Sequence, residues 1–127
     1  NLWFQSFDAE VKDPLKKYGP PKGALFIAYW NEAPAGCIAL QPLKEEGVCE
    51  MKRLYVKPAF RKYGIGRSLV EQLITESYQL GYAEMRLDTL ERLKPAISLY
   101  KSLGFENTQA YNENPLSGVV YMEKKIQ

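Results

Sequence analysis

The sequence predicts an α/β fold of the α+β kind, with a mixed, mostly antiparallel twisted sheet and flanking helices. Two stretches have the three-to-four-residue apolar spacing of amphipathic helices, and several short runs are alternating or continuously apolar, as strands are. In chain order these segments read β-β-β-α-β-α-β-β, which is typical of a sheet with helices packed on it. The 127 residues, 46% of them hydrophobic, fit a single domain over residues 1–127.

The N-terminal segment is predicted to be helical. Over residues 2–17, apolar side chains recur mostly three or four positions apart, which indicates one or two short helical turns that Pro14 interrupts. Residues 18–23 are rich in glycine and proline and predict a loop. The apolar residues concerned are Leu2, Phe4, Phe7, Val11 and Leu15.

Six strands are predicted in the rest of the chain. Residues 24–30 and 34–40 are apolar runs joined by Asn31-Glu32-Ala33, which indicates a hairpin. Residues 48–56 follow a polar connection and form a third strand. Residues 83–89 alternate strictly between apolar and polar, which predicts a half-buried fourth strand. Residues 105–110 and 119–125 complete the set, on either side of a loop over residues 111–118.

Two helices lie between the later strands. Residues 65–80 carry one apolar stripe and an opposite polar face, and Gly81 follows where a left-handed C-cap would end the helix. Pro95 can open the second helix at its first position, and Gly104 can close it.

The composition excludes several classes of function. The chain has no histidine, so catalysis by Ser-His-Asp or Cys-His groups is excluded. Cys37 and Cys49 lack a metal-site spacing and are expected to be core residues, so no metal is predicted. A net charge of +2 with dispersed lysines predicts no nucleic-acid partner, and no apolar run reaches the ~20 residues of a membrane span. Without a signal-peptide pattern, a cytoplasmic location is the default expectation.

Residues 61–68, Arg-Lys-Tyr-Gly-Ile-Gly-Arg-Ser, join a predicted strand to the first long helix. Their two glycines allow a ligand to approach the backbone, and the unpaired N–H groups of a helix's first turn suit a phosphate or pyrophosphate. Arg61 and Arg67 would add positive charge beside it. A tight turn without a ligand fits the spacing equally well. A P-loop and a dinucleotide fingerprint do not match, because position 61 is arginine and position 69 is leucine.

The pattern Arg61-x-x-Gly64-x-Gly66 resembles the signature of the GNAT N-acetyltransferase superfamily. Residues 54–58, Leu-Tyr-Val-Lys-Pro, look like the strand end that precedes it in that family. A second motif, Ala96-x-x-Leu99-Tyr100-x-x-x-Gly104-Phe105, follows in the expected order, and the resemblance covers roughly residues 24–126. It implies an enzyme that moves the acetyl group of acetyl-CoA directly to a primary amine of a small molecule or peptide.

The resemblance also implies where the cofactor lies. The sheet would be splayed between the strands at 48–56 and 83–89, with the CoA pantetheine in the gap, bound like an added strand along Leu54, Tyr55 and Val56. The family usually offers an asparagine before the second helix, where this chain has Glu91-Arg92-Leu93-Lys94-Pro95. It also begins earlier than this chain does, so its first strand and helix are expected to be missing. The pyrophosphate would be held by Arg61, Lys62, Tyr63, Gly64, Ile65, Gly66, Arg67 and Ser68.

Acetyl transfer needs a neutral amine, which costs roughly 4.6 kcal/mol at pH 7 for a lysine-like amine and about 1 kcal/mol for an α-amine. Glu50, on the strand that leads to the glycine loop, is the candidate base, acting through water. The alternative is that Glu50 only pairs with Lys52 or Arg53. Tyr100 matches the family's tyrosine that protonates the leaving thiolate, and the alternative is a core aromatic. A covalent acetyl-cysteine is a further alternative route.

Two other classes of function fit the same residues. A non-catalytic acyl-CoA-binding module would share the fold and the glycine loop, and a nucleotide-binding α/β domain would share the loop alone. The expected partners are acetyl-CoA and an amine acceptor, and a homodimer is possible because the fold often dimerises. The acceptor itself is not predicted, although residues 111–118 and the aromatic residues before position 24 are candidates to cover it.

Overall fold

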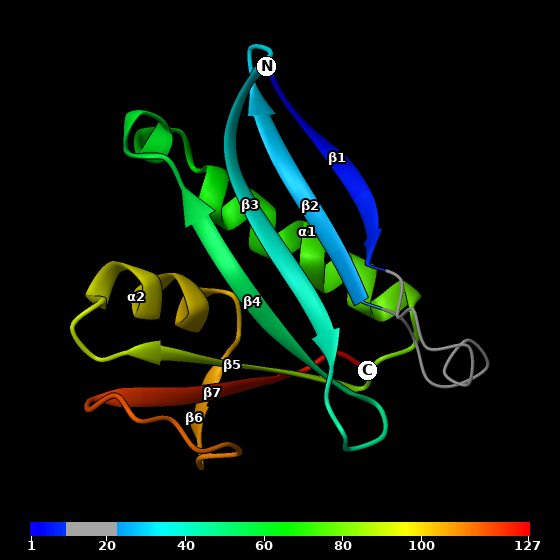
Figure 1. Ribbon diagram of the computed structural model, residues 1–127, viewed down its shortest axis with the longest axis vertical. Coiled ribbons are helices and arrows are strands. Elements are labelled where there is room, and N and C mark those ends of the chain that lie inside the picture. Colours follow the sequence, from blue (N-terminus) through cyan, green and yellow to red (C-terminus); the bar gives the residue numbers. More distant parts are fainter. Residues whose placement is uncertain (10–22) are drawn as a thin grey trace.

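The computed structural model describes residues 1–9 and 23–127, which form one seven-stranded sheet in the order β1-β2-β3-β4-β5-β7-β6 (Figure 1). Every neighbouring pair is antiparallel except β4 and β5. This confirms the predicted mixed, mostly antiparallel sheet with flanking helices. The elements are β1 (Leu2–Ala9), β2 (Gly23–Trp30), β3 (Ala33–Pro42), β4 (Val48–Val56), the 3₁₀ helix η2 (Pro58–Tyr63), α1 (Ile65–Gln79), β5 (Glu84–Leu90), α2 (Lys94–Ser102), β6 (Glu106–Thr108) and β7 (Val119–Lys125).

The prediction of helical turns is wrong for residues 2–9, which form the edge strand β1. Leu2 and Phe4 pack against the core, whereas Trp3 and Phe7 remain 38% and 39% exposed. Trp3 stacks on Tyr29 of the neighbouring strand, with ring centroids 4.1 Å apart. The segment therefore alternates between two faces, and the backbone pairing offered by the edge of β2 outweighs the looser helical spacing. The rest of the predicted turns, residues 10–17, lies outside the described residues, as does most of the predicted loop at 18–23.

The predicted hairpin is confirmed as β2 and β3. Its turn consists of Asn31 and Glu32, whose φ angles of 48° and 72° are both left-handed. Two consecutive left-handed residues are the geometry of a type I′ turn, whose twist matches that of the flanking strands. The third predicted strand, 48–56, is confirmed with the same bounds as β4.

Helix α1 covers one face of strands β2, β3 and β4 (Figure 1). Its predicted apolar stripe is confirmed, since Ile65, Leu69, Val70 and Leu73 are fully buried. Gly81 follows the helix with a φ of 91°, so the predicted left-handed stop is present. Helix α2 likewise has a proline in its first turn and is followed by Gly104 with a φ of 96°.

Strands β4 and β5 separate after a short parallel contact. They pair only where Val48–Glu50 lies beside residues 84–86, and no further register exists between them. The sheet therefore opens toward the carboxyl end of β4, as Figure 1 shows. Near this opening β4 carries a bulge, because Arg53 and Leu54 together oppose the single residue Ile38 of β3. Arg53 adopts a left-handed φ of 59°, which is uncommon for a residue with a side chain.

The short helix η2 between β4 and α1 was not predicted. Pro58 opens it, and Gly64 ends it with a φ of 71° and at the same time begins α1. Tyr63 stacks on Trp30 of β2, with ring centroids 4.5 Å apart and planes 13° from parallel. This contact fixes the approach to α1 against the sheet. Over residues 1–9 and 23–127, none of the helices has the length and apolarity that a bilayer crossing requires.

Candidate active site

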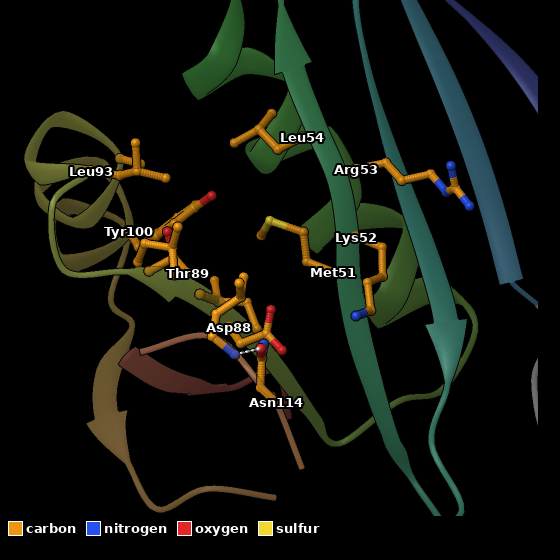
Figure 2. Close-up of a pocket in the computed structure, with 13 residues that line it drawn as sticks. Met51, Lys52, Arg53, Leu54, Asp88, Thr89, Leu93, Tyr100 and Asn114 are labelled. Atoms are coloured by element: carbon orange, nitrogen blue, oxygen red, sulfur yellow. Dashed lines mark hydrogen bonds between the residues drawn. The ribbon is translucent and has the colours of Figure 1, made fainter. Parts of the chain in front are cut away.

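A cleft of about 350 Å³ occupies the place where β4 and β5 separate (Figure 2). One wall is β4, the opposite wall is α2 with the turn before it, and β5 closes the inner end. Apolar side chains from both walls, among them Leu54 and Leu93, point into the space. The lining residues are Met51, Lys52, Arg53, Leu54, Leu87, Asp88, Thr89, Leu90, Leu93, Ala96, Tyr100, Asn114 and Leu116.

The glycine loop places the amino end of α1 beside this cleft. The amide of Ser68 donates to the Gly64 carbonyl over 3.2 Å, so it already has a helical partner. The amides of Ile65, Gly66 and Arg67 come before it, in the turn whose N–H groups lack intrahelical acceptors. Their direction and the helix dipole make this end of α1 suitable for an anion.

Gly66 is not required by the packing of the protein itself. A Cβ added there would lie 3.7 Å from the Val56 side chain and 3.8 Å from that of Leu99, which are ordinary contacts. Gly66 also lacks a left-handed φ, unlike Gly64. The protein's own packing and backbone therefore do not explain a glycine at position 66, whereas the close approach of a bound pyrophosphate to the backbone would.

The basic side chains of the loop are exposed and already have partners in the chain. The Arg61 Nε donates to the Val56 carbonyl over 2.9 Å, and its guanidinium lies 5.9 Å from the centre of the Tyr55 ring. Arg67 donates to the Ser102 hydroxyl of α2 over 2.9 Å. Lys62 lies 5.5 Å from the centre of the Tyr63 ring. These bonds hold the loop against β4 and α2 and keep its positive charge at the surface.

The predicted pantetheine strand, residues 54–56, forms the end of β4. Leu54 faces the cleft, Tyr55 is 50% exposed, and Val56 pairs with Gly36 of β3. Among the described strands, none pairs with the β5 side of β4 beyond Glu50. This edge therefore presents backbone groups to the cleft, where an extended ligand could add to the sheet.

Tyr100 lies on the α2 wall and points its hydroxyl into the cleft (Figure 2). Its side chain is buried, with 6% exposure, and its ring packs edge-on against Phe105 at 5.9 Å. Burial raises the pKa of Tyr100 to about 12. The hydroxyl is therefore fully protonated at neutral pH, and no described residue forms a hydrogen bond with it. Tyr100 is thus a core aromatic residue whose protonated hydroxyl faces the cleft.

Glu50 is held in a buried polar cluster on the face of the sheet opposite α1. It is 2% exposed and does not line the cleft. Its Oε1 accepts from Gln41 over 2.8 Å and lies 3.6 Å from the Lys52 ammonium, while its Oε2 accepts from the Tyr111 hydroxyl over 2.6 Å. The expected pairing with Lys52 is present, and pairing with Arg53 is not. Both carboxylate oxygens therefore have partners within the protein.

The loop at 111–118, which the sequence analysis names as a candidate to cover the acceptor, contributes individual residues that it did not name. Tyr111 packs edge-on against Tyr121, and the guanidinium of Arg86 lies 5.7 Å from the centre of its ring. Burial and the bond to Glu50 raise the pKa of Tyr111. Asn114 and Leu116 line the cleft. The loop's composition fits a plain surface loop equally well, and its path is not encoded in a periodic pattern, so the individual residues could not be predicted.

The two cysteines do not form a reactive pair. Cys49 is fully buried, and burial raises the pKa of its thiol to about 12. A thiol that stays protonated is a poor nucleophile. Cys37 donates to the Arg53 carbonyl over 3.3 Å. Within residues 1–9 and 23–127, no group of three or more acidic or cysteine side chains could hold a metal ion.

A splayed mixed sheet, a glycine turn that opens a helix beside the splay, and a tyrosine on the opposite wall come together around one cleft. Comparison with known proteins identifies the family. Residues 2–105 match the model of the acetyltransferase (GNAT) family, so the chain belongs to that family. It is an acetyl-CoA-dependent N-acetyltransferase.

Individual relatives support the same assignment. An uncharacterized N-acetyltransferase of Schizosaccharomyces pombe is 48% identical over 127 residues, covering 99% of this chain and 78% of that protein. The PaiA N-acetyltransferase of Thermoplasma acidophilum, solved in complex with coenzyme A, is 26% identical with a TM-score of 0.67, over 80% of this chain and 59% of that one. A Bacillus subtilis acetyltransferase in complex with CoA shares the fold, with a TM-score of 0.74 at 21% identity over 98% and 99% of the two chains.

Proposed function

We propose that this enzyme moves the acetyl group of acetyl-CoA directly to a primary amine of a small molecule or peptide, with Tyr100 as the acid and Glu50 as the final proton acceptor. The observation that carries the proposal is the Tyr100 hydroxyl, which is buried, protonated and directed into the cleft between β4 and α2. Acetyl-CoA supplies the thioester carbonyl that the amine attacks.

The chain's own groups would bind the donor in two places. The amides of Ile65, Gly66 and Arg67 at the start of α1 would hold the pyrophosphate, with Arg61 and Lys62 adding charge at the mouth. The open edge of β4 at Leu54 and Val56 would hold the pantetheine. The Val56 carbonyl already accepts from Arg61, so one of its two lone pairs is occupied.

The proton steps divide between two groups. Tyr100 would protonate the departing sulfur, because a phenol whose pKa is about 12 is protonated at neutral pH. The acceptor's ammonium would first lose a proton toward Glu50, through water or through the Tyr111 hydroxyl, which already donates to Glu50 over 2.6 Å, and the neutral amine would then attack the thioester. Direct transfer is favoured over a covalent route because the Cys49 thiol has a pKa of about 12.

The test is the variant Tyr100→Phe in a thiol-release assay with a panel of amines, amino acids and peptides. We expect kcat to fall ten-fold or more while the affinity for acetyl-CoA, measured by titration calorimetry, is unchanged. Tyr78→Phe is the matched control, since Tyr78 is 59% exposed and does not line the cleft. Wild-type turnover in Tyr100→Phe would contradict the acid role.

A further inference from the structure

A second hollow adjoins the cleft on the face of the sheet opposite α1. Its volume is about 470 Å³, and it spans β2, β3 and β4. Lys52 and Arg53 line both this hollow and the cleft, so these two residues form the border between the two spaces. The described residues that line the hollow are Ala24, Leu25, Ala39, Leu40, Gln41, Lys52 and Arg53.

The floor of the hollow is apolar. Register places Leu25 beside Ala39, and Ala39 beside Lys52, in one row across the sheet. Phe7 of β1 continues the row next to Leu25 and is 39% exposed. An aliphatic or aromatic group could therefore lie along this row, while a charged group would meet the β4 end of it.

Arg53 provides an unpaired cation at that end. Its left-handed φ of 59° lies at the bulge of β4. Its guanidinium extends away from Tyr100 and across β3 (Figure 2). No carboxylate of the described residues lies within 4.0 Å of it. A guanidinium without such a partner is suited to a ligand's carboxylate, which it can bind with two parallel hydrogen bonds.

The opposite charge lies on the same strand but is buried. The Glu50 carboxylate is 2% exposed, lies 3.6 Å from the Lys52 ammonium and lines neither space. A ligand that carries a carboxylate would therefore balance this arrangement of two cations beside one buried anion. A polyamine would instead meet the charges of Lys52 and Arg53 without compensation, and a peptide N-terminus would bring an uncharged amide to Arg53.

We propose that the amine acceptor is an amino acid with an apolar side chain, whose carboxylate binds Arg53 and Lys52 and whose side chain lies over Leu25 and Ala39. This inference rests on the proposed function, because it names the acceptor of the same reaction. It places the α-amine at the border between the hollow and the cleft, where the donor's thioester is expected.

The kinetic test compares alanine, leucine, methionine and phenylalanine with the corresponding amino-acid amides. An amide lacks the carboxylate and has the lower amine pKa, so intrinsic reactivity favours it at pH 7.5. We expect the reverse order, with kcat/KM at least ten-fold higher for one or more free acids. Arg53→Asn should lower that value by about 10- to 100-fold, through KM, and should leave the amides unchanged. Asparagine is chosen because it tolerates the left-handed backbone.

Lys44→Met is the matched control, because Lys44 is an exposed cation that lines neither space. Arg53→Lys should recover part of the lost activity. Free acids and amides used equally well, or an Arg53→Asn variant with an unchanged KM, would overturn the inference.

A binding experiment separates this inference from the proposed reaction. The same acids and amides are titrated into the CoA-loaded protein and followed by NMR chemical shifts, with no turnover needed. The inference is supported if a free acid binds at least ten-fold more tightly than its amide, and if Arg53→Asn weakens binding of that acid at least ten-fold. This holds even if no amine is acetylated, in which case only the proposed reaction fails. Equal binding of acids and amides overturns the inference even if some other amine is acetylated.

Discussion

Replacing Gly66 by alanine separates what the fold needs from what a bound ligand needs. The added methyl group would make only ordinary contacts, at 3.7 Å to Val56 and 3.8 Å to Leu99. Gly66 is the second residue of α1, where alanine is the better helix former by about 0.5–1 kcal/mol. At about 4 °C per kcal/mol for a domain of this size, the free protein should melt about 2–4 °C higher.

The same methyl group would stand between the loop backbone and a pyrophosphate. If it weakens CoA binding ten-fold, the stabilisation at a ligand concentration of 100 times the wild-type Kd falls from about 2.7 to about 1.4 kcal/mol. The assay is thermal unfolding with and without CoA, supported by titration calorimetry. Wild-type CoA affinity in Gly66→Ala would refute the reasoning that the ligand lies against this backbone.

Gly64 and Gly81 provide a matched pair for the same experiment. Both have left-handed φ angles, of 71° and 91°, and a Cβ on either would meet nothing within 4 Å. Alanine should cost about 1–2 kcal/mol of stability at each position through backbone strain alone. Only Gly64 lies at the amino end of α1, so only Gly64→Ala should also weaken CoA binding. Equal CoA affinities in the two variants would place the ligand elsewhere.

Three further predictions concern stability. Burial raises the pKa of Tyr100 in the folded state from 10.0 to about 12, so its contribution to the free energy of unfolding is complete below pH 10 and is lost as the pH rises toward 12. Tyr100→Phe should therefore lose about 3 kcal/mol less stability over this range than the wild type, as urea unfolding at a series of pH values would show. Tyr111→Phe should cost about 1.5–3 kcal/mol in urea unfolding, because the buried Glu50 carboxylate loses its 2.6 Å donor, and a cost near zero would mean that water replaces the hydroxyl. Burial opposes ionisation of Glu84, but hydrogen bonds from Arg86 and Lys125 lower its pKa below 4.5. The stability that Glu84 contributes is therefore present above pH 4.5 and is lost as the pH falls. Glu84→Gln should be less stable than the wild type at pH 7, and its stability should fall less steeply on acidification.

Local patterns were sufficient for most of the fold. The stripe from Ile65 to Leu80, the alternation in 83–89 and the stops at Gly81 and Gly104 were predicted correctly because each is a property of neighbouring residues. Residues 2–9 were predicted wrongly because their spacing is ambiguous and the deciding factor, the open edge of β2, is more than ten residues away in the chain. The helix η2 was missed because its anchor, the stack of Tyr63 on Trp30, is also a distant contact.

The candidate site divides in the same way. The glycine turn, its helix and Tyr100 could be named from the sequence, since each belongs to a short motif with a fixed spacing. The sequence alone thus determined the family of folds, and it named the residues that we propose as the CoA half of the site. The burial of Glu50 under Tyr111, the entry of Asn114 into the cleft and the left-handed Arg53 were decided only by tertiary structure. They depend on where β4 bulges and how residues 111–118 cross the sheet, and such long-range geometry leaves no periodic signal in the chain.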